Sequence, residues 1–344
     1  MSAPKTLNDA DLVDAIAREV GVSHSTVRRC LSGAEARYGA TARRMAEIRS
    51  VAERLGYVPN SAARALRRGR FDSVAMLGSQ DRLHGYLPDA LLSALHDQFA
   101  RRGVRLTIAR VEDAVVTDGT RLRPLLQRIG ADGLILDYID YVPPGLTATL
   151  AATRLPMVWI NRDAACDAVR VDDRAGVRQI ALALRARGRR RIAYVDFSHD
   201  AGDDRAHYSS AERLRGWQEI CADAPCFQAY VPAAERLAAA RRWLRGLPQP
   251  PDAVIGYSAD HAAICMTAAL QEGLPAPAVS DLGAVDESPW LLGAAYVCAR
   301  LPFAAIAAAT VDLLLRRIDH DGEPQPAVIV PPDLHAGTTG QGQP

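Results

Sequence analysis

Ser258 stands where a hydrolytic nucleophile could stand. The segment Gly256-Tyr-Ser-Ala-Asp260 follows a predicted strand and precedes a predicted helix, which is the context of a nucleophile elbow. The elbow pattern G-x-S-x-G fails at its last position, and the sequence identifies no base for Ser258. An ordinary strand-to-helix turn explains the segment as well, so a hydrolase is kept only as an alternative function.

Other residue types that carry chemistry occur without the spacing that chemistry needs. The acid pairs Asp172-Asp173 and Asp203-Asp204 form no metal-ligand pattern and are typical of turns, and no P-loop or dinucleotide fingerprint occurs. Because the cysteines include no C-x-x-C pair, we expect reduced, buried thiols. We therefore expect no catalytic residue, no metal and no cofactor. The cysteines are Cys30, Cys166, Cys221, Cys226, Cys265 and Cys298.

Charge is distributed unevenly along the 344 residues. The formal net charge is only +1, but Met1–Arg70 holds 13 basic against 7 acidic residues, which leaves 28 against 33 for the rest. A basic segment on a mildly acidic remainder favours a nucleic-acid-binding domain attached to a larger one. The length predicts two or three domains, and 49% hydrophobic and 24% charged residues are typical of globular proteins.

Three helices are predicted in the basic segment, over residues 11–20, 24–31 and 41–55. Apolar residues recur at helical spacing in each, Gly21 ends the first helix, and Ser23 is a good N-cap for the second. The second helix should bury Val27 and face Arg28 and Arg29 outward. Two short helices joined by a glycine-containing turn form a helix-turn-helix. A three-helix bundle with solvated arginines remains the alternative interpretation.

Beyond residue 72, strand-like runs alternate with amphipathic helical stretches, which predicts parallel sheets in an open α/β fold. The number of units favours two such sheets. Strands are predicted at 73–77, 105–109, 133–136, 157–160, 192–195, 253–256 and 282–285, and helices at 87–101, 174–187, 211–221, 233–245 and 261–271.

Motifs along nearly the whole chain resemble the lactose-repressor/galactose-repressor (LacI/GalR) family of transcriptional regulators. They are Gly21-Val-Ser-His-Ser-Thr-Val-Arg-Arg29, Leu55-Gly-Tyr-Val-Pro-Asn60, Leu155-Pro-Met-Val-Trp-Ile-Asn-Arg162 and Ser209-Ser-Ala-Glu-Arg-Leu-Arg-Gly-Trp217. The resemblance implies an all-α helix-turn-helix headpiece and an α/β periplasmic-binding-protein-like effector domain of two Rossmann-like lobes. The expected parts are a DNA-binding domain at 1–58, a hinge at 59–70, a first lobe at about 71–165 plus 298–318, and a second lobe at about 166–297 plus 319–335.

By this resemblance, the second helix enters the major groove of DNA. His24, Ser25 and Arg29 would read bases, and Arg29 suits a bidentate bond to guanine. The DNA backbone would be contacted by Thr26, Arg28 and Asn60. The family usually has Ser where this chain has Arg28 and Asn where it has Ser32, and the extra charge should strengthen phosphate binding or alter the operator that is recognised.

The segment around residues 60–69 would be the family's hinge helix, which inserts a leucine from each subunit into the minor groove and kinks the DNA. Leu66 matches that leucine, and Ala63 precedes it by one turn. The alternative is that Leu66 is a buried anchor of an ordinary linker helix.

The family's effector positions map to Tyr86, Asn161, Arg162, Arg213, Trp217 and Asp286, in a cleft between the lobes. Arginine, aspartate and asparagine together suit polyhydroxyl groups. Arg213 could instead be a solvated helix charge, and Tyr86, Trp159 and Trp217 could be sugar-stacking walls or core. The family's usual Asn-Asp is Ala259-Asp260 here, an arginine is replaced by Gly337, and the first-lobe entry is His84-Gly-Tyr-Leu87. A carbohydrate effector is favoured, with another polar metabolite or no effector left open.

The predicted protein is thus a regulator, favoured as a repressor, that binds double-stranded operator DNA under control of a small molecule. We expect a homodimer because one recognition helix reads only a half-site, with a tetramer left open. We expect it in the cytoplasm, on the nucleoid when DNA-bound, because neither a membrane span nor a signal peptide is recognisable.

Overall fold

The structure is a computed structural model that describes residues 9–31, 42–57, 69–81, 85, 87–139, 141–200, 206–283, 297–320 and 323–336. The chain divides into two compact units, an N-terminal unit of Met1–Asp72 and a C-terminal unit of Ser73–Pro344. This boundary lies within two residues of the one predicted between the hinge and the lobes. Across the described ranges, no helix is both long and apolar enough to span a membrane.

The described part of the N-terminal unit contains three helices that pack against one another: α1 (Asp9–Val20), α2 (His24–Leu31) and α3 (Ala42–Arg54). Each contributes a side chain that is fully buried, namely Ile16, Val27 and Ile48. Gly21 has a φ of +67° between α1 and α2, a left-handed conformation that glycine adopts without steric cost. All three predicted helices are confirmed within two residues of their predicted ends.

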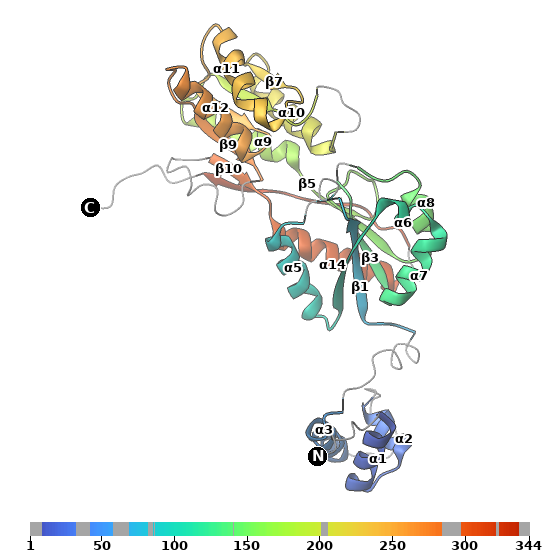
Figure 1. Cartoon of the computed structure of the whole chain (residues 1–344). Helices are drawn as coiled ribbons and strands as arrows, with labels where there is room; N and C mark the ends of the chain where they lie inside the picture. Colours follow the sequence, from blue (N-terminus) through green and yellow to red (C-terminus); the bar gives the residue numbers. More distant parts are fainter. Residues whose placement is uncertain are drawn as a thin grey trace, which may run out of the picture. The chain divides into compact units, whose positions relative to one another are not determined.

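The C-terminal unit contains two six-stranded sheets, as the alternation of strands and helices predicted (Figure 1). Among the strands of the described residues, every pair is parallel except β10 with β12. The first sheet has the order β11-β5-β4-β3-β1-β2, with β1 (Ser73–Ser79), β2 (Arg105–Val111), β3 (Gly133–Asp137), β4 (Met157–Ile160), β5 (Ala168–Val171) and β11 (Val328–Val330). The second has the order β12-β10-β9-β8-β6-β7, with β6 (Ile192–Asp196), β7 (Cys226–Gln228), β8 (Ala253–Gly256), β9 (Ala278–Leu282), β10 (Val297–Arg300) and β12 (Asp333–Ala336).

Helices cover both faces of the first sheet and complete what we call the first lobe (Figure 1). Side chains alternate along a strand, so that in β1 Met76 packs towards one layer of helices while Leu77 packs towards the other. The layer beside Met76 is α5 (Asp89–Ala100) and α14 (Phe303–Asp319), and the layer beside Leu77 is α6 (Asp113–Val116), α7 (Gly119–Ile129) and α8 (Leu146–Ala151).

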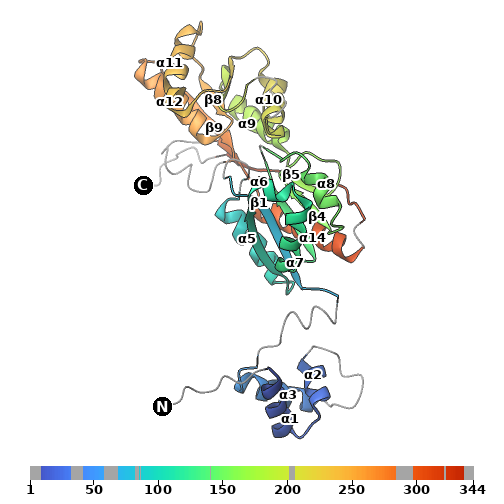
Figure 2. The ribbon, with the colours of Figure 1, turned by 45° about the vertical axis from the view of Figure 1, so that its right-hand side comes forward.

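The second lobe repeats this three-layer design around the second sheet (Figure 2). In β6, Tyr194 packs with one pair of helices and Val195 with the other. The first pair is α9 (Asp173–Ala186) and α10 (Tyr208–Cys221); the second is α11 (Arg236–Gly246), which follows the short 3₁₀ helix η2 (Ala233–Glu235), and α12 (Ala259–Gln271). Because helices cover both faces of each sheet, the strands are short, nearly continuous apolar runs in the sequence.

The chain passes between the lobes three times in the described residues, and all three predicted crossing points were wrong. The predicted second lobe began at about 166, but β5 pairs with β4 in the first lobe, so the first crossing follows Val171. The return was predicted at 298, but β10 pairs with β9 through Ala299 and belongs to the second lobe. Strand β11, predicted in the second lobe, pairs with β5 in the first.

Two further predictions need correction. The strand predicted at 282–285 ends at Leu282, because Ser280 and Asp281 are buried and pair in register with β8 although they are polar. The cysteines were predicted to be packed, but Cys166 and Cys226 are exposed, whereas the other four are buried.

Candidate functional site

Helix α2 presents a polar surface to solvent, as its sequence pattern predicted. His24, Ser25, Arg28 and Arg29 are exposed, whereas Val27 is buried in the core of the N-terminal unit. An exposed helix face with two adjacent guanidinium groups is suited to contact phosphates and base edges.

The start of α2 is organised by the hydroxyl of Ser23. Its Oγ accepts a hydrogen bond from the backbone N–H of Thr26 at 3.2 Å, which is the N-cap contact predicted. The same oxygen lies 2.8 Å from the hydroxyl oxygens of both Ser25 and Thr26. The two hydroxyls predicted to contact DNA are therefore already oriented within the protein.

His24 is tied to α1 rather than free in solvent. Its Nε2 lies 3.0 Å from Oδ1 of Asp14, and both side chains are about half exposed. Any base contact by His24 must compete with this contact. The first helix thus helps to orient the first residue of the second.

Several predicted site residues lie outside the described residues. They are Asn60, Ala63 and Leu66 of the hinge, and Tyr86 and Asp286 of the effector site.

A cavity of about 490 Å³ lies between the two lobes of the C-terminal unit. It is formed largely at the carboxyl ends of β4, β5, β8 and β9, where ligands bind in open α/β sheets. The described residues that line it are Leu91, Ile139, Ile160, Asn161, Val169, Arg170, Val171, Asp173, His207, Ser209, Arg213, Tyr257, Ser258, Ala259, Asp260, Asp281, Leu282, Gly283, Leu301, Phe303 and Ile306.

The two sides of the cavity differ in chemistry. The first lobe and its connection to α14 contribute mainly aliphatic side chains and the ring of Phe303. The second lobe contributes most of the charged and hydroxyl-bearing side chains. A ligand in this cavity would therefore meet directed polar groups on one side and an apolar wall on the other.

Arg213 is held in the cavity wall by contacts with several elements of the second lobe. Its Nε donates to Asp173 Oδ1 at 2.7 Å, its Nη1 donates to the carbonyls of Leu282 and Tyr257, and its guanidinium lies 4.5 Å from the centre of the Tyr257 ring. Burial is the largest single influence and lowers the pKa of Arg213, but Asp173, Tyr257 and Tyr194 together raise that pKa above that of an ordinary arginine. The alternative of a solvated helix charge is wrong, since the side chain is only 10% exposed.

A close approach of α10 to α9 places Arg213 beside Asp173. A Cβ on Gly216 would lie 2.2 Å from the carbonyl oxygen of Arg174, so only glycine fits this crossing. Asp172 caps α9 by accepting from the N–H of Ala175 at 3.0 Å, as expected of a turn acid, which leaves Asp173 for the ion pair.

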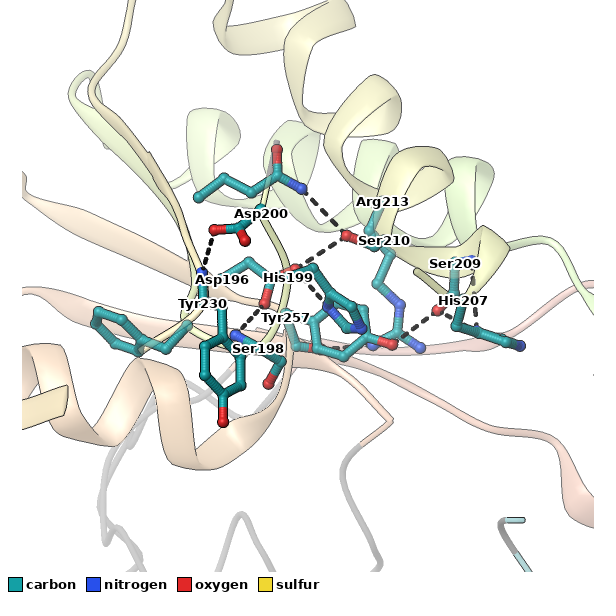
Figure 3. A network of polar contacts seen from close by, with 12 residues as sticks. Asp196, Ser198, His199, Asp200, His207, Ser209, Ser210, Arg213, Tyr230 and Tyr257 are labelled. Carbon is teal, nitrogen blue, oxygen red and sulfur yellow. Dashed lines mark hydrogen bonds and ion pairs between the residues drawn. The ribbon is translucent and has the colours of Figure 1, made fainter. Parts of the chain in front are cut away.

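Hydrogen bonds connect further cavity residues around Arg213 (Figure 3). The hydroxyl oxygens of Ser209 and Tyr257 are 2.9 Å apart, and Ser209 Oγ lies 2.7 Å from Nδ1 of His207. Burial raises the pKa of Tyr257, so its hydroxyl stays protonated and can donate. The second-lobe side of the cavity wall therefore contains a connected polar network.

The structure brings two of the predicted effector residues, Asn161 and Arg213, to the cavity and leaves two others out. The Arg162 guanidinium stacks 4.4 Å from the centre of the Trp159 ring instead of lining the cavity. Trp217 is 2% exposed in the core of the second lobe, where its Nε1 donates to the carbonyl of Ile192. Its placement in the effector site was wrong because α10 turns that face towards the sheet.

Ser258 lacks the surroundings of a nucleophile. Its Oγ donates to the carboxylate of Asp260, and it occupies the N-cap position of α12 with extended backbone angles rather than the strained ones of an elbow. Gly256 is needed because a Cβ there would lie 2.5 Å from the Ser258 carbonyl oxygen. The strand-to-helix turn is the correct interpretation.

The sequence did not identify His207, Ser209, Tyr257, Asp173 or Arg170 as cavity residues. For all of these except Arg170, which lies within β5, a detectable signal was the position directly after a strand or at a helix start, where side chains face the crevice of an α/β sheet.

Comparisons with known proteins agree with this architecture. A model for the periplasmic binding protein-like domain matches residues 181–339. The chain is 30% identical over 337 residues to the HTH-type transcriptional regulator PtxS of Pseudomonas plecoglossicida, which covers 91% of this chain and 92% of that protein. The chain belongs to the LacI/GalR family. As a LacI/GalR member it is a DNA-binding transcriptional regulator and not an enzyme.

Solved structures of LacI/GalR proteins share the fold. The Lac repressor dimer bound to operator and the anti-inducer ONPF has a TM-score of 0.74, with 20% identity over 97% of this chain and 99% of that chain. A complex of the regulator CelR with cellobiose has a TM-score of 0.61, with 21% identity over 95% and 99% of the two chains.

Proposed function

We propose that this LacI/GalR protein is a repressor that binds a two-fold-symmetric operator as a homodimer and changes its affinity when a carbohydrate occupies the interlobe cavity. The observation that carries the effector part is the cavity itself, with Arg213 held rigidly in its wall. The protein acts on nucleoid DNA in the cytoplasm.

The N-terminal unit supports operator binding. Its helix α2 exposes His24, Ser25 and Arg29, which we assign to base readout, while Thr26 and Arg28 contact phosphates. One such helix reads one half-site, so a two-fold-symmetric operator requires two copies of the chain. The Lac repressor, whose fold this chain shares, is described as a dimer bound to operator.

The proposal also includes residues of the hinge and two further effector residues. We assign Asn60 to the DNA backbone, and Ala63 and Leu66 to the minor groove, on the family's pattern. Tyr86 and Asp286 are assigned to the effector on the same ground.

Polar groups of the second lobe support a polyhydroxylated effector. Within the described residues, Nη2 of Arg213 makes no hydrogen bond, although Nε and Nη1 are fixed by protein acceptors. A guanidinium anchored on one side and open on the other is a directed donor for hydroxyl or carboxylate oxygens. The shared fold with a cellobiose complex of CelR supports a sugar as the ligand class.

A thermal-shift screen of monosaccharides, disaccharides and sugar acids tests the effector assignment. A true effector at 100 times its Kd should add about 2.7 kcal/mol of stability. The shift should disappear in Arg213→Lys, which keeps the charge but loses the planar fork. Arg215→Lys on the exposed side of the same helix is the matched control and should keep it. A shift that survives Arg213→Lys would place the ligand elsewhere, and no response to any sugar would remove the carbohydrate class.

A further inference from the structure

Residue Asn161, at the end of β4 in the first lobe, is held by two consecutive residues of the second lobe. Nε2 of His207 donates to the Asn161 carbonyl at 2.8 Å, and the hydroxyl of Tyr208 donates to Asn161 Oδ1 at 3.0 Å. His207 is 7% exposed, so its hydrogen bond is largely shielded from water. Asn161 has a φ of +57°, a left-handed conformation that asparagine tolerates better than most residues.

The contacts of His207 define its tautomer. A carbonyl oxygen only accepts hydrogen bonds, so Nε2 must carry the proton. On the other side of the ring, Nδ1 accepts from the backbone N–H of Ser209 as the N-cap of α10. His207 therefore holds the start of α10 with one nitrogen and the first lobe with the other.

Tyr208 adds a second connection between the lobes. The guanidinium of Arg170, on β5 of the first lobe, lies 5.3 Å from the centre of the Tyr208 ring. Burial raises the pKa of Tyr208, so its hydroxyl remains a hydrogen-bond donor. His207 and Tyr208 of the second lobe therefore both contact the first lobe, at the edge of the cavity.

The same contacts continue into the effector site. Asn161, His207, Ser209, Tyr257 and Arg213 form one connected series in which every member lines the cavity. A ligand that engages Tyr257 or Arg213 acts on the network that also holds Asn161.

We propose that His207 and Tyr208 form an interlobe latch on Asn161 and are positioning residues for the effector response, setting the balance between closed and open lobes. The link to the effector rests on the function proposed above. A ligand shifts this balance only as far as it favours one arrangement over the other, so the strength of the latch decides how large the response is. Losing one such hydrogen bond changes an equilibrium constant roughly two- to tenfold.

An interlobe distance measurement on the full-length, ligand-free protein tests the latch. Exposed Cys166 near β5 and exposed Cys226 on β7 place a native spin-labelling site on each lobe. In double electron–electron resonance, Tyr208→Phe and His207→Ala should each move population from the wild-type distance to a longer one, by roughly two- to tenfold in the ratio.

Two further variants separate the latch from a general structural role. His207→Gln can donate to Asn161 and accept from Ser209, and it should restore the wild-type distances. Tyr230→Phe, at a 62% exposed tyrosine of the same lobe, should also leave them unchanged. The latch would be overturned if all four variants had the distance distribution of the wild type. It would also be overturned if His207→Gln lengthened the interlobe distance as much as His207→Ala. Since no ligand is used, such a failure is distinct from a failure to find a carbohydrate effector.

Discussion

The carboxylate of Asp173 and the guanidinium of Arg213 form an ion pair that is almost completely removed from solvent, with side chains 2% and 10% exposed. Asp173 is the first residue of α9, and Arg213 lies in the middle of α10, 40 residues further along the sequence. Removing charges from water is costly, so the pair is weak evidence for stability. Its effect is to fix the orientation of the guanidinium, so that Nη2 of Arg213 is held in a defined position in the cavity wall.

Asp173→Asn should therefore destabilise the C-terminal unit by about 3 kcal/mol, because it leaves a buried guanidinium without its counter-charge. Urea denaturation followed by circular dichroism measures the loss. Asp172→Asn is the matched control: asparagine caps helices nearly as well as aspartate, so its effect should stay within about 0.5 kcal/mol. Equal stability of both variants would show that Asp173 does not compensate Arg213.

The elements of this protein differ in how far the sequence could predict them. Helix α2 was predicted with its observed ends, His24 and Leu31, because an N-cap serine and one buried stripe determine it locally. Strand β9 was misplaced because its polar residues are buried between two other strands, which local patterning does not reveal. The crossings between the lobes depend on strand pairing across long stretches of chain, which has no local signature.

The candidate site shows the same division. Arg213 was predicted from its motif, but three of its acceptors, Asp173 and the carbonyls of Tyr257 and Leu282, come from separate elements. Main-chain carbonyls carry no signal in side-chain sequence. The latch residue His207 was missed because its partner is also a carbonyl, 46 residues away.

Arg29→Ala should weaken binding to the operator by about 1–3 kcal/mol and relax the preference at one base position. The reason is that a bidentate arginine contact distinguishes guanine from other bases. Fluorescence anisotropy with operators substituted at single positions measures this. Arg28→Ala is the comparison: it should weaken all sequences alike and lower the salt slope by about 1. A base preference unchanged by Arg29→Ala would exclude Arg29 from readout.

Leu66→Ala should reduce the bend in operator DNA, because an apolar wedge between base steps supports the kink. A circular-permutation gel assay compares the bend angles. Leu66→Met keeps an apolar wedge and should preserve the bend. If the alanine variant bends DNA as strongly as the wild type, Leu66 is an anchor of the linker rather than a wedge.

Acidification should destabilise the second lobe through His261, which is 1% exposed. Its Nδ1 accepts from the N–H of Phe197 at 3.3 Å, and its Nε2 lies 3.2 Å from Ser198 Oγ. Burial lowers the pKa of His261 below its ordinary 6.5, with Arg236 and His199 acting in the same direction and Asp260 and Asp196 against it. The folded protein thus keeps the ring neutral at a pH where the unfolded chain binds a proton.

The sign of the pH dependence follows from this difference. Stability is fully present above pH 6.5 and falls as the pH drops below it, because the unfolded state then binds more protons than the folded state. His261→Gln should flatten this part of the curve of unfolding free energy against pH, measured by urea denaturation between about pH 7 and 5. His96→Gln removes a surface histidine whose side chain is 69% exposed and should leave the slope unchanged. A slope that is the same in His261→Gln and wild type would assign the acid sensitivity to other groups.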